Sequence, residues 1–95
     1  MTIVLYYDTM TLRKKHKSTL SAIFAEPTRA NIHWNDVESL LNALGADCSE
    51  GSGSRLRVRL NDVKAVLHRS HPEKEASKSM VKSIRRFLDE AGIEP

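Results

Sequence analysis

The chain contains little cysteine and no long apolar stretch, and each absence excludes a class of protein. With Cys48 as its single cysteine, the 95-residue chain can form no internal disulfide and no cysteine-rich zinc site. A reducing cytoplasm is therefore the expected location. No apolar run approaches the roughly 18 residues that a membrane span needs. The short apolar stretch at residues 3–5 follows no basic segment, so no secretory signal is expected.

Two kinds of ligand site are also missing. No set of His, Asp and Glu has the spacing of a metal site, so neither a metal nor another cofactor is expected. The glycines of residues 51–53 form too short a stretch for a phosphate-binding loop of the mononucleotide or dinucleotide type. The composition, 40% hydrophobic and 28% charged, is that of an ordinary soluble globular domain.

The net charge of +3 hides a strong asymmetry along the chain. Residues 54–86 contain ten lysines and arginines against three acidic residues, whereas the remainder has five basic and nine acidic residues. A basic half on a small domain is typical of a protein that binds nucleic acid or an acidic protein partner. A solvated surface without a partner would have the same composition.

Residues 1–11 are expected to form an extended or disordered lead, and residues 12–95 a single domain. The apolar pattern of residues 12–25 predicts an additional N-terminal helix, which ends before Pro27. Its lysines could extend a basic surface. Alternatively, its apolar side could contact a partner or simply cover the domain, and the sequence does not choose among these.

Two more helices flank a set of strands. Apolar residues at helical spacing predict a helix over residues 35–44, with Asn35 and Glu38 in a capping arrangement. The last helix is expected to begin at Ser77, its N-cap, and to stop at Gly92. A strand over residues 46–50, with a buried Cys48, and two alternating segments lie between them. The order α-α-β-β-β-α predicts an α+β domain in which a three-stranded antiparallel sheet packs against helices.

The two alternating segments, residues 54–60 and 63–68, predict a hairpin with Asn61 and Asp62 as its turn. With this turn the core face pairs Leu60 with Val63, Val58 with Ala65 and Leu56 with Leu67. The other face pairs Arg59 with Lys64, Arg57 with Val66 and Arg55 with His68. A slip by one residue would place charges in the core, so the register is strongly specified.

The pair Arg55–His68 is the candidate for chemistry. Facing residues have Cβ atoms roughly 4.5–5.5 Å apart, close enough for both side chains to act on one phosphate. Histidine exchanges protons near neutral pH, and RNA carries its own nucleophile in the 2′-hydroxyl. A metal-independent ribonuclease therefore needs a base, an acid and a cation beside the phosphate. His71 lies three residues further on. Spacing alone favours the simpler interpretation of His68 as an exposed strand histidine without a catalytic role.

Four segments together resemble, in order and spacing, the HicA family of bacterial toxins. They are Trp34 with Val37-Glu38-Ser39-Leu40-Leu41 and Leu44-Gly45-Ala46; Gly53-Ser54-Arg55; His71-Pro72-Glu73-Lys74-Glu75; and Val81-Lys82-Ser83-Ile84-Arg85 with Ala91-Gly92-Ile93. The resemblance covers roughly residues 32–93. It implies a double-stranded-RNA-binding-domain-like fold and cleavage of mRNA by an endoribonuclease. It also implies neutralisation by a HicB-type antitoxin in a toxin–antitoxin hetero-oligomer.

The chain departs from the family at one position. HicA proteins usually carry Gly-Ser-His at the start of the second strand, and that histidine is catalytic, whereas this chain has Arg55 there. Arginine stays charged and is a very poor proton shuttle. Our hypothesis is that Arg55 holds the phosphate while His68, with or without His71, handles protons. The alternatives are an RNA- or antitoxin-binding module of the same fold that has lost catalysis, and a basic interaction domain unrelated to toxicity. The expected RNA-binding residues are Ser54, Arg55, Arg57, Arg59, Lys64, Lys74, Lys78 and Lys82.

Overall fold

The computed structural model describes residues 12–69 and 74–95, so the expected lead at 1–11 and the candidate His71 lie outside the described residues. Along the chain the elements are α1 (Lys14–Ile23), β1 (Ile32–His33), α2 (Trp34–Ala43), β2 (Asp47–Glu50), β3 (Arg55–Leu60), β4 (Val63–His68), β5 (Glu75–Ala76) and α3 (Lys78–Glu90). The strands β2, β3 and β4 form an antiparallel sheet in that order, and β1 pairs with β5 in a second, two-stranded sheet.

This is the α+β architecture that the sequence predicts, and it is compatible with a double-stranded-RNA-binding-domain-like fold. The β1–β5 pair is an addition that no sequence pattern indicates. Among the described residues, no helix combines the length and the apolar character that crossing a membrane requires.

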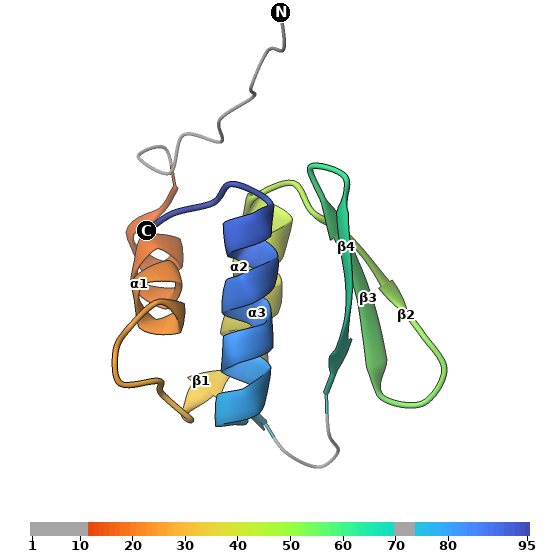
Figure 1. Ribbon diagram of the computed structural model, residues 1–95, viewed down its shortest axis with the longest axis horizontal. Coiled ribbons are helices and arrows are strands. Elements are labelled where there is room, and N and C mark those ends of the chain that lie inside the picture. The colour runs from red at the N-terminus through yellow and green to blue at the C-terminus, as the bar shows by residue number, and fades with distance from the viewer. Residues whose placement is uncertain (1–11, 70–73) are drawn as a thin grey trace, which may run out of the picture.

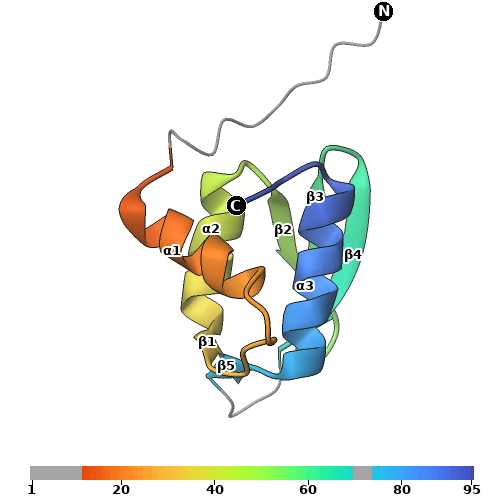
Figure 2. The ribbon, with the colours of Figure 1, turned by 60° about the vertical axis from the view of Figure 1, so that its left-hand side comes forward.

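The elements form three layers. In Figures 1 and 2 the sheet β2–β3–β4 lies on one side, α2 and α3 cover one of its faces, and α1 lies beyond them. The apolar face of β3, which carries Leu56, Val58 and Leu60, is buried under the helices. The opposite face of this sheet is left to solvent.

The place of α1 settles a question that the sequence leaves open. Its apolar side chains Leu20 and Ile23 are fully buried, and α1 packs on α2 and α3. That apolar side therefore covers the core of the domain and is not available to a partner. Since α2 and α3 separate α1 from the sheet, the lysines of α1 do not extend the solvent face of the sheet.

The hairpin β3–β4 has the predicted register, from Leu60 opposite Val63 to Arg55 opposite His68. Both turn residues have positive φ, 50° at Asn61 and 68° at Asp62, as a two-residue hairpin loop with the favoured twist requires. Asn and Asp tolerate this conformation better than other non-glycine residues. The side chain of Asn61 also donates to the Ala91 carbonyl at 2.9 Å, which ties the turn to the end of α3.

The predicted cap of α2 is wrong. The helix begins at Trp34, its N-cap is His33 without a side-chain hydrogen bond, and Asn35 lies inside the first turn. The Trp34 N–H instead donates to the Lys74 carbonyl at 2.9 Å, beside the β1–β5 pair. A tertiary hydrogen bond thus satisfies one of the first N–H groups of the helix, which have no acceptor within the helix itself. The cap of α3 is as predicted, because Ser77 Oγ accepts from the Met80 N–H at 3.2 Å.

Candidate functional site

The solvent face of the sheet presents side chains in cross-strand rows. One row holds Asp47, Arg59 and Lys64, the next holds Ser49, Arg57 and Val66, and the third pairs Arg55 with His68. All of these side chains are exposed. We call the five basic residues of these rows the basic sheet face: Arg55, Arg57, Arg59, Lys64 and His68.

Backbone hydrogen bonds determine how closely Arg55 and His68 approach. The Arg69 N–H donates to the Ser54 carbonyl at 2.9 Å, and the Gly51 N–H donates to the Arg55 carbonyl at 2.9 Å. The backbone of Arg55 thus bonds toward β2, so Arg55 and His68 form a non-hydrogen-bonded antiparallel pair. Such pairs have the closer of the two Cα separations, about 4.5 Å, and the closer side chains. A guanidinium and an imidazole are therefore brought side by side on an exposed face.

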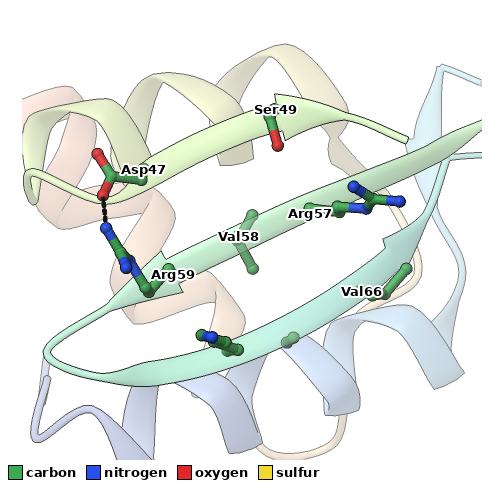
Figure 3. Close-up of a pocket in the computed structure, with 8 residues that line it drawn as sticks. Asp47, Ser49, Arg57, Val58, Arg59 and Val66 are labelled. Atoms are coloured by element: carbon green, nitrogen blue, oxygen red, sulfur yellow. Dashed lines mark hydrogen bonds and ion pairs between the residues drawn. The ribbon is translucent and has the colours of Figure 1, made fainter.

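An open groove of about 550 Å³ lies next to this pair, over the middle of the sheet. Its lining residues come from all three strands (Figure 3). They are Asp47, Ser49, Arg57, Val58, Arg59, Lys64, Ala65 and Val66. Val66 is 52% exposed and is the one large hydrophobic residue with such exposure among the described residues.

The charges in the groove are not equivalent. Arg59 donates from Nη2 to Asp47 Oδ2 at 2.8 Å, and this hydrogen bond and charge raise the pKa of the Arg59 guanidinium above its usual value. No carboxylate of the described chain lies within ion-pair distance of Arg55, Arg57 or Lys64. The free positive charge is therefore concentrated on these three residues, and Arg59 is partly neutralised.

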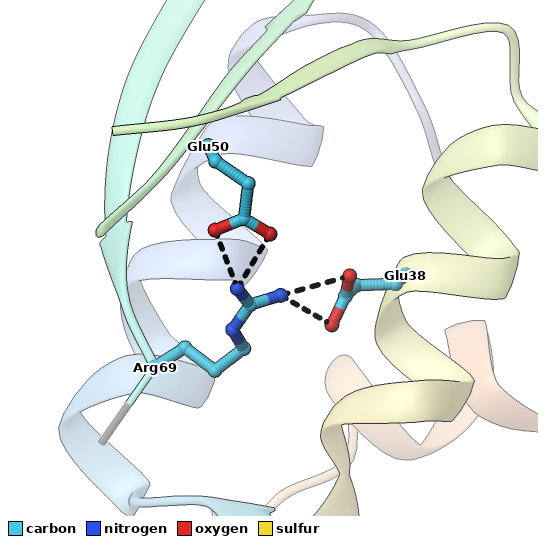
Figure 4. Close-up of polar contacts among 3 residues, drawn as sticks. All are labelled: Glu38, Glu50 and Arg69. Carbon is cyan, nitrogen blue, oxygen red and sulfur yellow. Dashed lines mark hydrogen bonds and ion pairs between the residues drawn. The ribbon is translucent and has the colours of Figure 1, made fainter. Parts of the chain in front are cut away.

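Arg69 follows His68 directly but points to the helix side of the sheet (Figure 4). Its guanidinium donates from Nη2 to both oxygens of Glu50 at 2.7 Å and from Nη1 to both oxygens of Glu38 at 3.0 Å. The pKa of Arg69 is raised, first by its hydrogen bonds to Glu50 and Glu38 and then by the charges of the same two carboxylates. One side chain thus joins the end of β4 to β2 and α2, on the side of the sheet opposite the Arg55–His68 pair.

Comparison with known proteins identifies the family. The sequence model described as the HicA toxin of bacterial toxin–antitoxin systems matches residues 34–93. The chain belongs to the HicA toxin family. No curated protein and no solved structure matches it.

The structure separates the expected RNA-binding residues of this HicA chain into two groups. Arg55, Arg57, Arg59 and Lys64 share the solvent face of the sheet, where Ser54 lies just before β3. The lysines Lys74, Lys78 and Lys82 lie on the segment before β5 and on α3, and none of them lines the groove. The basic sheet face and the lysines at positions 74, 78 and 82 therefore form two distinct basic surfaces.

The contribution of β2 to this face is not predicted by the sequence pattern. The side chains of Asp47 and Ser49, two residues apart on β2, both point to this face. The connection at residues 51–54 is too long to fix the register of β2 against β3 as a two-residue turn would. The burial expected for Cys48 is also wrong, because every residue of the edge strand β2 is exposed. Its pKa is nevertheless raised, first by partial burial and then by the charges of Glu38 and Asp47.

The part of the chain that the structure describes contains no group of three or more His, Cys, Asp or Glu that could hold a metal ion. The basic sheet face has instead the properties of a surface for an anion with several charges. Guanidinium groups suit phosphates because they offer several donors in a fixed plane.

Proposed function

We propose that this HicA toxin is a metal-independent endoribonuclease that cleaves mRNA in the cytoplasm at a site built on Arg55 and His68. The observation that carries the proposal is the closeness of this cross-strand pair on an exposed basic face. Membership of the HicA family supports the reaction class.

In this proposal the Arg55 guanidinium binds the scissile phosphate and stabilises the charge that develops on its oxygens. The His68 imidazole takes the proton of the neighbouring 2′-hydroxyl, whose oxygen attacks the phosphorus. The bond to the 5′-oxygen breaks, and that oxygen receives a proton from a second group. His71 is the candidate donor from the sequence. The products would be a 2′,3′-cyclic phosphate and a 5′-hydroxyl.

The test is brief expression of the chain in cells, with growth and the integrity of transcripts as readouts. His68→Ala, His71→Ala and Arg55→Ala are expressed separately. His33→Ala is the matched control, because His33 is an exposed strand histidine on the other sheet, 3.7 Å from Glu75. We expect His68→Ala and Arg55→Ala to abolish cleavage while His33→Ala retains it. Parental toxicity in all three site variants would refute the assignment.

A second candidate function is a binding module of the same fold that has lost catalysis. The specific observation in its favour is Arg55, since an arginine cannot replace the histidine that the family usually has at this position. Growth arrest with intact transcripts, unchanged by His68→Ala, would favour this function over cleavage.

We further propose that a HicB-type antitoxin neutralises the toxin by covering the basic sheet face. A partner there would block the phosphate site and relieve the repulsion among the arginines at the same time. Purification of the chain with the product of its neighbouring gene tests this. Weaker association after Arg55→Ala and Arg57→Ala is the expected result, and unchanged association would refute it.

A further inference from the structure

The groove beside the Arg55–His68 pair has no assigned occupant. We propose that it binds one nucleoside of single-stranded RNA, adjacent to the phosphate held by Arg55 and His68. This inference rests on the proposed function and specifies the form of its substrate. It adds Val66, Ser49 and Asp47 to the residues that contact RNA.

The Arg57 side chain is turned toward the Arg55 end of the face. A Cβ placed on Gly51 would lie 3.5 Å from Arg57 Nε and 3.1 Å from the Arg55 Cβ, so Arg57 lies against the glycine at the Arg55 end of the face. In Figure 3 the Arg57 guanidinium points along β3, away from Arg59. The free guanidinium group of Arg57 therefore lies at the same end of the face as Arg55, on the β2 side of β3. The middle of the groove, beside Val66 and Ser49, is left open for an uncharged group.

The open middle of the groove has the size and the polarity for a nucleoside. Its volume of about 550 Å³ lies in the range of small-ligand sites. Val66 offers an apolar surface within a basic surround. A duplex presents its phosphates outward and keeps its bases stacked inside, so it would gain little from Val66. Bases of a single strand are free to contact such a side chain while the backbone follows the positive charges.

The spacing of the arginines along β3 suits an extended strand of RNA. Alternate residues of β3 lie about 6.6–6.8 Å apart along the strand. The Cα atoms of Arg55 and Arg57 are separated by this interval, and the turn of the Arg57 side chain toward Arg55 lets both guanidinium groups serve neighbouring phosphates of one strand. Arg59, one interval further, is held by Asp47 at 2.8 Å, so the row of free charge ends there. A short extended segment of RNA fits this arrangement.

The experiment measures fluorescence anisotropy of labelled 2′-O-methyl RNA, which lacks the nucleophile and is not cleaved. A short single strand is compared with a duplex of the same sequence, over a series of salt concentrations. Arg57→Gln should lower the salt slope for the single strand by about 0.7, the loss of one phosphate contact. The matched control is Arg13→Gln, the same change of charge at the start of α1, and it should leave the slope nearly unchanged.

A gain-of-function variant tests the nucleoside directly. Val66→Tyr offers a ring on which a base can stack, so affinity for the single strand should rise about fivefold or more, with little change for the duplex. Thermal melting of each variant verifies folding. Equal affinity of Val66→Tyr and parent for the single strand, or equal gains for both probes, overturns the inference.

The outcomes distinguish this inference from the proposed function. If the parent cleaves transcripts and His68→Ala does not, while Arg57→Gln and Val66→Tyr bind RNA as the parent does, only the groove assignment fails. If the parent never cleaves but the variants change single-strand affinity as expected, only the catalytic proposal fails. If the same substitutions weaken only antitoxin association, the groove belongs to the protein partner and the inference is overturned.

Discussion

Replacement of Arg69 by methionine should destabilise the fold by about 2 kcal/mol. The substitution keeps an apolar stem but removes the guanidinium that holds Glu38 and Glu50 at 3.0 and 2.7 Å. Exposed ion pairs contribute at most about 1 kcal/mol, and loss of one partner of a buried pair costs roughly 3–5 kcal/mol. The Arg69 side chain is 18% exposed, and those of Glu38 and Glu50 are 31% and 67% exposed, so water can solvate part of the freed charge. The expected cost therefore lies between the two limits.

For a domain of this size, 2 kcal/mol corresponds to a fall in melting temperature of roughly 8–16 °C. Thermal unfolding followed by circular dichroism is a sufficient assay. The matched control is Arg59→Met, which removes an ion pair of similar length between exposed side chains and should melt close to the parent. Arg69→Lys should be intermediate, because an ammonium group cannot hold two carboxylates in one plane.

A double-mutant cycle then separates the two partners. Glu38→Gln and Glu50→Gln are each combined with Arg69→Met, and the coupling energy should be larger for Glu38, whose carboxylate is less exposed. The reasoning is refuted if Arg69→Met and Arg59→Met melt alike. In that case the half-buried position of Arg69 gives its ion pairs no advantage over an exposed ion pair.

Three further predictions concern other parts of the fold. The Arg85 guanidinium donates to the carbonyls of Ile23 and Ala25, at the end of α1, at 2.9 and 3.0 Å. Arg85→Met removes this donor, so we expect the free energy of unfolding in urea to fall by about 1–3 kcal/mol. Gly51→Ala brings a Cβ to 3.1 Å from the Arg55 Cβ, so transcript cleavage should slow while the melting temperature changes little. The raised pKa of Cys48 leaves less thiolate at neutral pH. Iodoacetamide should therefore alkylate the folded chain more slowly than the urea-unfolded chain, and the difference should shrink as pH rises above the folded-state pKa.

Each of these has a clear contrary outcome. Unchanged urea unfolding of Arg85→Met would mean that water replaces the guanidinium at no cost. If Gly51→Ala cleaves transcripts as fast as the parent, either Arg55 has no role in cleavage or β3 shifts enough to accommodate the added methyl group. Equal alkylation rates of Cys48 in folded and unfolded chains would contradict the shielding that raises its pKa.

The register of the β3–β4 hairpin could be predicted from sequence because its determinants are local. Alternation puts every apolar residue on one face, Asn61 and Asp62 suit the turn, and any slip would bury charge. The same reasoning placed Arg55 opposite His68, and thereby the core of the candidate site. The ends of α3 could be predicted for a similar reason. Ser77 caps the first turn with its own side chain, and Gly92 adopts the positive φ that ends the helix.

Other features depend on contacts between segments far apart in the chain, and only the tertiary structure decides them. The Trp34 N–H donates to the carbonyl of Lys74, and no side chain caps α2. Arg69 and Arg85 belong to the basic half of the sequence, but the fold turns both toward carboxylates and carbonyls of distant elements. The alternation of apolar and polar residues along a strand determines which face of the sheet each side chain occupies. The packing of the layers determines which carboxylate or carbonyl a charged side chain contacts there, and no local sequence pattern contains that information.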